Sequence, residues 1–119
     1  MTTSALQVAK EALESLDVDK ILSAYAENFL FEDRAAGEAI QDRSALRAYF
    51  QKLFTFPGVR FSDIRVFDGD DFAALEWTWS GVKRITGEPF HVRGASVIEL
   101  YQGKICRETI YYDPRPALA

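Results

Sequence analysis

The sequence has very little of the two residue types that most often bind metals or form cross-links. It contains one cysteine, Cys106, and one histidine, His91, in 119 residues. One cysteine cannot form an internal disulfide, and these two residues alone cannot supply the ligands of common zinc, haem or iron–sulfur sites. The GxGxxG, P-loop, HExxH and GxSxG motifs are absent as well. We therefore expect no metal and no cofactor, and chemistry that relies on carboxylates, tyrosines and the shape of a cavity.

Positive charge and long apolar runs are also scarce. The 14 Lys and Arg residues are outnumbered by 18 Asp and Glu residues, giving a net charge of −4. This balance argues against a nucleic-acid partner, because phosphate binding requires clustered cations. No apolar run approaches the roughly twenty residues that a membrane span requires. The first residues, MTTSAL, lack the pattern of a signal peptide, and together with the lone cysteine they lead us to expect a cytoplasmic location.

What is present is an ordinary globular composition, with 48% apolar and 27% charged residues. We expect one domain over residues 1–119, with an ordered core at about 6–113 and a proline-containing tail. Capping residues and apolar spacing predict three helices in the first half. The expected helices cover about residues 4–16, 17–26 and 43–54.

The second half carries the alternation of apolar and polar residues that is typical of strands. We expect four long strands there, preceded by a short strand at 29–33 and an irregular loop at 34–40. The long strands are expected at about 59–67, 72–83, 90–101 and 104–113. Helices on one side of an antiparallel sheet make an α+β fold. Because long strands twist, the sheet is expected to curl around the helices into a cone with an open end.

The hairpin at 94–113 controls which side chains face the inside of this cone. A three-residue loop, Tyr101–Gly103, would place Ser96 opposite Glu108. A two-residue loop would shift one strand by a residue and reverse the face of Glu108. We favour the three-residue loop, in which Glu108 lies on an inward face with Ile110 and Tyr112. The alternative is an outward Glu108 paired with a cation on the neighbouring strand.

Asp33 is the second acidic candidate, because it ends an apolar strand just before the irregular loop. A carboxylate among aromatic side chains would be desolvated, which suits a general base. The alternative is a structural role, either in an ion pair with Arg34 or as the cap of the next turn. His91 is a weaker candidate for proton transfer, with a surface position as its alternative. Tyr112 is a candidate hydrogen-bond donor.

Aromatic and small side chains on the expected inner face are candidate ligand contacts, although the same residues would also suit a filled core. These candidates are Tyr25, Phe29, Phe31, Phe61, Trp77, Trp79, Ser96 and Ile110.

The order and spacing of several short stretches resemble the nuclear transport factor 2-like superfamily, and within it the SnoaL-like polyketide cyclase and ketosteroid isomerase branch. The stretches are AYAENFLFED at 24–33, Gly37, the helix from about Arg43, WSG at 79–81, GKI at 103–105 and YYD at 111–113. The resemblance covers about residues 6–113. It implies a cone of curved sheet with three helices, a hydrophobic cavity and a homodimer formed through the sheet. It also implies an inward Glu108.

For the reaction, the resemblance places Asp33 at the position of the catalytic base of ketosteroid isomerases. The tyrosine and aspartate that form their oxyanion hole, a worked example of pKa tuning, would fall near Ala9 and at Ser96, so neither is preserved. The catalytic residues of the related epoxide hydrolases would fall near Pro89, His91 and Ile110, and are likewise replaced. The cyclases use an acidic residue near the end of the last strand, which makes Asp113 a further candidate.

We therefore expect a protein that binds a small, largely apolar organic molecule in the cone. Proton transfer on that molecule would use Asp33 as base, with Glu108 or Tyr112 as acid or hydrogen-bond donor. The alternative is a non-catalytic ligand-binding or dimerisation module of the same fold.

Overall fold

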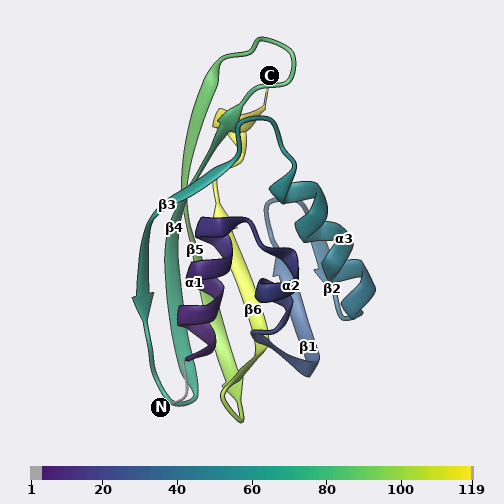
Figure 1. Cartoon of the computed structure of the whole chain (residues 1–119), viewed down its shortest axis with the longest axis vertical. Helices are drawn as coiled ribbons and strands as arrows, with labels where there is room; N and C mark the ends of the chain where they lie inside the picture. The colour runs from purple at the N-terminus through teal and green to yellow at the C-terminus, as the bar shows by residue number, and fades with distance from the viewer. Residues whose placement is uncertain (1–3, 119) are drawn as a thin grey trace.

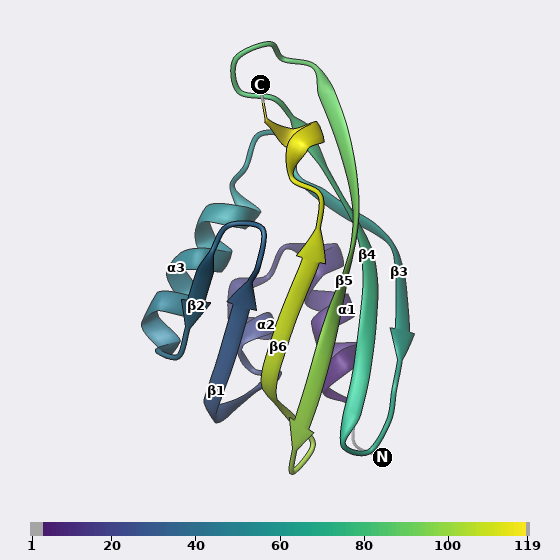
Figure 2. The same cartoon turned by 180° about the vertical axis from the view of Figure 1, so that it is seen from behind.

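The chain folds as a curved six-stranded sheet with three helices on its concave side. The computed structural model describes residues 4–118, so the ends of the expected domain at 1–3 and 119 lie outside the described residues. Figure 1 shows the helices in front of the sheet, and Figure 2 shows the opposite face, where the strands are uncovered. The expected α+β cone is confirmed, and its sheet does not close into a barrel. The strand order is β2-β1-β6-β5-β4-β3.

The element boundaries follow the sequence signals closely. The helices are α1 (Ala5–Ser15), α2 (Val18–Leu22) and α3 (Arg43–Phe54), and a short 3-10 turn, η1 (Arg115–Ala117), follows the last strand. The strands are β1 (Tyr25–Asp33), β2 (Glu38–Ile40), β3 (Arg60–Phe67), β4 (Phe72–Val82), β5 (Pro89–Tyr101) and β6 (Lys104–Tyr112). Ser4, Asp17 and Asp42 cap the three helices by accepting from backbone N–H groups.

The segment after α2 differs from the sequence prediction. The helix was expected to continue to about Ala26, but it ends at Leu22, and Tyr25 is already the first residue of β1. Two tertiary contacts account for the early end of the helix. Tyr25 pairs with Ile105 of β6 in the sheet. The Arg43 guanidinium of α3 donates to the carbonyls of Leu22, Tyr25 and Ala26. Those carbonyls are therefore satisfied without a further helical turn.

The sheet is mixed rather than wholly antiparallel. Strands β3 to β6 are antiparallel, as expected, but β1 lies parallel to β6. The loop expected at 34–40 contains the three-residue strand β2, which pairs with the end of β1. The bulge expected in β3 is confirmed by a register shift between Ser62 and Arg65, where Asp63 has a positive φ of 50°.

The observed register of the β5–β6 hairpin differs from the predicted one, although Glu108 still faces the interior. The loop has two residues, Gln102 and Gly103, both with positive φ as a type I′ turn requires. Ser96 therefore lies opposite Ile110, and Glu108 lies opposite Ile98. A register shift at Cys106 adds one residue to β6 and so cancels the reversal that a two-residue loop would cause. Glu108 faces the interior as predicted, although its cross-strand partner was predicted wrongly.

The core lies between the concave face of the sheet and the helices. Its most deeply buried apolar side chains include Leu6 of α1, Leu46 of α3 and Phe31 of β1, so both the helices and the sheet contribute to it. Trp77 reaches across the sheet over Gly94, where an added Cβ would lie 2.3 Å from the indole ring. This close approach explains a glycine in the middle of β5.

Candidate functional site

A cavity of about 70 Å³ lies between the sheet and the helices. It is lined mainly by apolar and aromatic side chains, and Glu108 is the one acidic residue among them. The lining residues are Ala9, Leu13, Ile21, Tyr25, Phe31, Tyr49, Phe50, Leu53, Phe61, Leu75, Trp77, Trp79, Ser96, Ile98, Ile105, Glu108, Ile110 and Tyr112. By volume it has room for a few water molecules or a small organic group. We call it the inner cavity.

Glu108 is buried in this wall, with 6% of its surface exposed. The Tyr25 hydroxyl donates to Glu108 Oε1, and the Trp77 Nε1–H donates to the Ser96 hydroxyl at 3.1 Å. Burial raises the pKa of Glu108 above its ordinary value, and this effect outweighs the opposing hydrogen bonds from Tyr25 and Ser96. The site therefore combines a carboxyl group whose pKa is raised with apolar walls.

Asp33 is also buried, with 2% of its surface exposed, but it lies outside the inner cavity. Its Oδ2 atom accepts from the hydroxyls of Tyr49, at 2.8 Å, and Tyr112, at 3.0 Å. Its Oδ1 atom accepts from the Ala36 N–H at 3.0 Å and so caps the β1–β2 turn. Arg34 contacts Glu32 at 3.9 Å instead of Asp33. One carboxylate oxygen of Asp33 therefore has the turn-capping role given above as an alternative, and the other oxygen is bound by two tyrosines.

Asp33 lines a second, larger hollow on the outside of the molecule, which we call the outer groove. It encloses about 830 Å³ between the β1–β2 turn, α3 and the C-terminal segment. Its lining residues are Asp33, Ala35, Ala36, Glu38, Ala39, Ile40, Ala45, Ala48, Tyr49, Lys52, Leu53, Phe56, Trp79, Tyr112, Pro114, Ala117 and Leu118. The groove therefore joins residues that are far apart in the sequence.

Both tyrosines that bind Asp33 remain donors under ordinary conditions. Burial raises the pKa of Tyr49 well above its usual range, and the nearby Asp33 charge raises it further. The same two causes, in the same order, raise the pKa of Tyr112. Each hydroxyl therefore keeps the proton that it donates to the Asp33 carboxylate.

The structure brings most of the predicted site residues to the inner cavity. Those that line it are Tyr25, Phe31, Phe61, Trp77, Trp79, Ser96, Glu108, Ile110 and Tyr112. Phe29 is buried but lines neither hollow, and it packs instead against Tyr25 with a ring-centroid distance of 5.6 Å.

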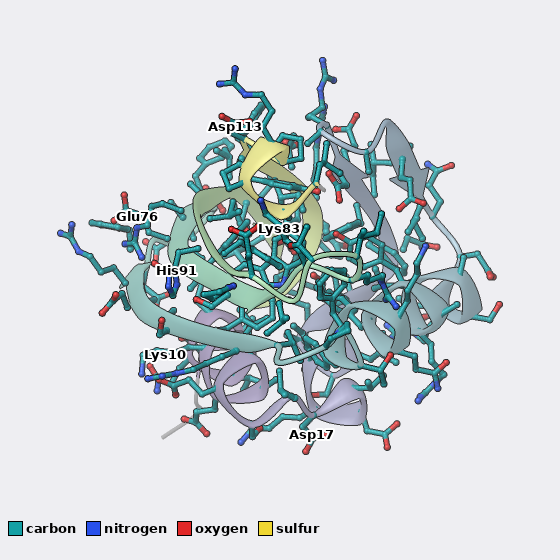
Figure 3. The ribbon with its side chains drawn as sticks, turned by 90° about the horizontal axis from the view of Figure 1, so that it is seen from above. Lys10, Asp17, Glu76, Lys83, His91 and Asp113 are labelled. Atoms are coloured by element: carbon teal, nitrogen blue, oxygen red, sulfur yellow. The ribbon has the colours of Figure 1, made fainter. Side chains whose placement is uncertain are left out.

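His91 and Asp113 lie at the surface and line neither hollow. His91 Nδ1 lies 2.8 Å from the Ser80 hydroxyl. Asp113 binds the Arg115 guanidinium, which lowers the pKa of that carboxyl. In Figure 3, Asp113 lies beside the yellow C-terminal turn, and His91 lies away from it, on the side of the labelled Glu76. For His91, the structure thus gives the surface position that was the alternative interpretation.

Tyr49 is the main site residue that the sequence analysis did not single out. It lies on the apolar face of α3 beside Phe50, with the two rings 5.3 Å apart. A hydroxyl on the buried face of a helix requires a partner, and that signal was available. The identity of the partner was not, because Asp33 lies sixteen residues earlier and meets Tyr49 only through packing.

Among residues 4–118, no group of three or more His, Cys, Asp or Glu side chains is placed to hold a metal ion. Within the same part of the chain, none of the helices has the length and apolar character to cross a membrane. One buried side-chain donor in this range, Trp79 Nε1, has no hydrogen-bond partner.

Comparison with known proteins matches residues 7–108 to the model of the SnoaL-like domain. A protein from Catenulispora acidiphila with a ketosteroid isomerase-like fold, solved with trimethylamine, has a TM-score of 0.82 at 15% identity, over 98% of this chain and 91% of that one. A proposed polyketide cyclase from Pseudomonas putida has a TM-score of 0.79 at 20% identity, over 97% and 96%. An NTF2-like protein from Burkholderia thailandensis has a TM-score of 0.81 at 20% identity, over 97% and 95%. None of the curated proteins compared with the chain matches it.

Proposed function

The chain belongs to the SnoaL-like domain family, and from this premise we propose that it binds a small, largely apolar organic molecule and transfers a proton on it. The observation that carries the proposal is Glu108, a buried carboxyl group in the apolar wall of the inner cavity. Solved structures of the same fold that are described as a proposed polyketide cyclase and a proposed isomerase support acid–base chemistry without identifying the substrate.

Glu108 is the group best placed to move the proton. Burial raises its pKa above the ordinary value of a carboxyl, and a carboxyl whose pKa lies closer to the working pH is a more effective acid–base group. The Tyr25 hydroxyl on Oε1 holds the side chain in place. Asp33, predicted from the sequence as the base, faces the outer groove and is engaged by three donors. Its catalytic role therefore stays a prediction beside that of Glu108.

The size of the inner cavity limits what reaches Glu108. Ligand pockets for drug-sized molecules enclose about 300–1,000 Å³, whereas the inner cavity encloses about 70 Å³. The reacting part of the ligand is therefore a small group, such as the end of a chain or a short ketone. The fold relative from Catenulispora acidiphila, solved with trimethylamine, is an example of a very small molecule bound to this fold.

Exchange of the α-hydrogens of butanone in deuterated water, followed by NMR, tests the proposal with a probe of suitable size. The Glu108 carboxylate accepts an α-proton, which leaves the enolate of butanone. The carboxyl group then exchanges this proton for a deuteron from the solvent and returns the deuteron to the α-carbon, which regenerates the ketone and the carboxylate. We expect the protein to accelerate exchange, with a rate that rises with pH as Glu108 ionises. Glu108→Gln should reduce the rate by about a hundredfold or more, the usual contribution of an acid–base residue.

Glu99→Gln is the matched control, because Glu99 lies on the outer face of β5 and pairs with Arg107 at 3.7 Å. Equal exchange by the wild type and Glu108→Gln would refute the assignment. Loss of exchange in Asp33→Asn, with exchange retained in Glu108→Gln, would move the role of base to Asp33.

The alternative is a non-catalytic ligand-binding module, and the small volume of the inner cavity favours it. In that case butanone or a similar probe raises the Tm through binding but undergoes no accelerated exchange. Measuring thermal unfolding and exchange in the same samples separates the two functions.

We further propose a homodimer formed through the outer face of the sheet. Three apolar side chains on the uncovered face of β5 and β6 support it: Val97, Tyr101 and Tyr111 are 55%, 62% and 52% exposed. Exposed apolar groups on adjacent strands are typical of an interface. Light scattering at micromolar concentration should give the mass of two chains, and a monomeric mass would contradict the proposal.

A further inference from the structure

Four side chains separate the inner cavity from the outer groove. Tyr49 and Leu53 of α3, Trp79 of β4 and Tyr112 of β6 line both hollows. No other residue is shared by the two linings. These four side chains, which we call the partition, therefore form the boundary that the groove shares with the inner cavity.

Asp33 holds half of this partition in place. Its Oδ2 atom accepts from Tyr49 of α3 and from Tyr112 of β6, so one carboxylate oxygen ties together side chains from two different elements. Asp33 itself lines only the groove. The turn N–H of Ala36 holds the other carboxylate oxygen and fixes the direction of the group. Hydrogen bonds to an ionised acceptor are stronger than neutral ones, which suits a closure that must hold until a ligand arrives.

We propose that Asp33, Tyr49 and Tyr112 form a gate, and that a ligand reaches Glu108 from the outer groove when the two hydroxyls leave Asp33 Oδ2. Asp33 then acts as a positioning residue. The inference rests on the proposed function in one respect, namely that the inner cavity is the destination of the ligand. The inner cavity admits only a small end group, whereas the groove, at about 830 Å³, accommodates a larger body. The ligand that fits both therefore has two parts.

A cysteine placed inside the inner cavity reports on the gate without any catalysis. Ala9 of α1 lines that cavity and is 4% exposed, so Ala9→Cys in a Cys106→Ser background places one thiol behind the partition. Its reaction with methyl methanethiosulfonate, followed by mass spectrometry, measures how often the cavity opens. Tyr49→Phe, Tyr112→Phe and Asp33→Asn should each accelerate labelling by about tenfold or more, the effect of losing one hydrogen bond to a charged group.

Global unfolding would also expose the thiol, and urea distinguishes the two routes. Labelling through the gate exposes little surface and should depend weakly on urea, whereas labelling through unfolding rises steeply with it. Tyr25→Phe is the matched control: it also removes a buried tyrosine hydroxyl bonded to a carboxyl group, but outside the partition. It should not produce the urea-insensitive acceleration. Ser96→Cys, also inside the cavity, is a second reporter if Ala9→Cys does not fold.

The gate is refuted if all three variants label at the rate of the reporter protein, or if their acceleration follows urea as unfolding does. The labelling readout does not require proton transfer by Glu108. A failure of butanone exchange would therefore remove the proposed reaction and leave the gate intact, while unchanged labelling would remove the gate alone.

Discussion

Burial shifts the protonation equilibrium of Glu108 toward the neutral carboxyl group. Its pKa is raised from 4.5 chiefly because the folded protein removes water from the carboxyl group. The same group in the unfolded chain titrates near its ordinary value. Glu108 therefore connects the chemistry of the inner cavity to the pH dependence of stability, since the folded state binds this proton more tightly than the unfolded state does.

The sign of this linkage gives a prediction for Glu108→Gln. The stabilising contribution of the neutral carboxyl is complete below about pH 4.5 and decreases as the pH rises through the folded pKa. Glutamine has no such dependence, so the variant should gain stability relative to the wild type as the pH rises. Urea unfolding of both proteins at a series of pH values measures the difference. A difference between the two proteins that does not change with pH would contradict the prediction.

Gly94 provides a second prediction at the scale of single residues. An added Cβ would lie 2.3 Å from the Trp77 ring, so Gly94→Ala forces a side chain of the cavity wall to move. We expect a loss of about 1–3 kcal/mol in the free energy of unfolding, as for other overpacked sites. The loss should be smaller in a Trp77→Phe background, where the ring is shorter. Equal losses in both backgrounds, measured by urea unfolding, would show that the contact with Trp77 is not the cause.

Among the elements, α3 does more than cover the sheet. Its apolar face supplies Tyr49 and Leu53 to the partition. At the start of the same helix, Arg43 donates to the carbonyls of Leu22, Tyr25 and Ala26. Helix α3 is thereby connected both to the site and to the segment where α2 becomes β1.

Arg43→Ala tests this connection. We expect a loss of about 1.5–3 kcal/mol, because charge-assisted hydrogen bonds to three carbonyls are removed together. Arg47→Ala on the same helix is the control. Its ion pair with Asp19 is exposed, so its loss should stay within about 0.5 kcal/mol. Chemical unfolding measures both, and equal stabilities of the two variants would contradict a special role for Arg43.

For the whole molecule, the fold places one face of the sheet toward the helices and leaves the other uncovered, as Figure 2 shows. The inner face carries the site, and the outer face carries the proposed dimer contact. The two surfaces are therefore separable by mutation, since alternate residues of β5 point to opposite sides. The cytoplasmic location expected from the sequence stays a prediction.

Val97→Glu should shift the protein from dimer to monomer, because it introduces a charge at the centre of the exposed apolar group on β5 and β6. Ile85→Glu is the control, since Ile85 is 83% exposed but lies in the β4–β5 loop. Light scattering over a range of concentrations measures both masses. Equal masses for the two variants would place the dimer contact elsewhere.

The sequence alone determined the local features of this protein. Helix caps at Ser4, Asp17 and Asp42 act within a few residues, and the strand alternation that places Trp77 inward is visible in the chain. These signals predicted the α+β cone, and the family resemblance agreed with them. The inward face of Glu108 was also predicted, but through the wrong loop length, because a bulge and a turn each shift the register by one.

Only the tertiary structure decided what surrounds the two carboxyl groups. The tyrosine partners of Asp33 lie 16 and 79 residues away, and the parallel pairing of β1 with β6 brings together the first and the last strand of the chain. The small inner cavity, the outer groove and the partition between them result from packing across several elements. No pattern within one element contains that information, because each wall of the two hollows comes from a different part of the sequence.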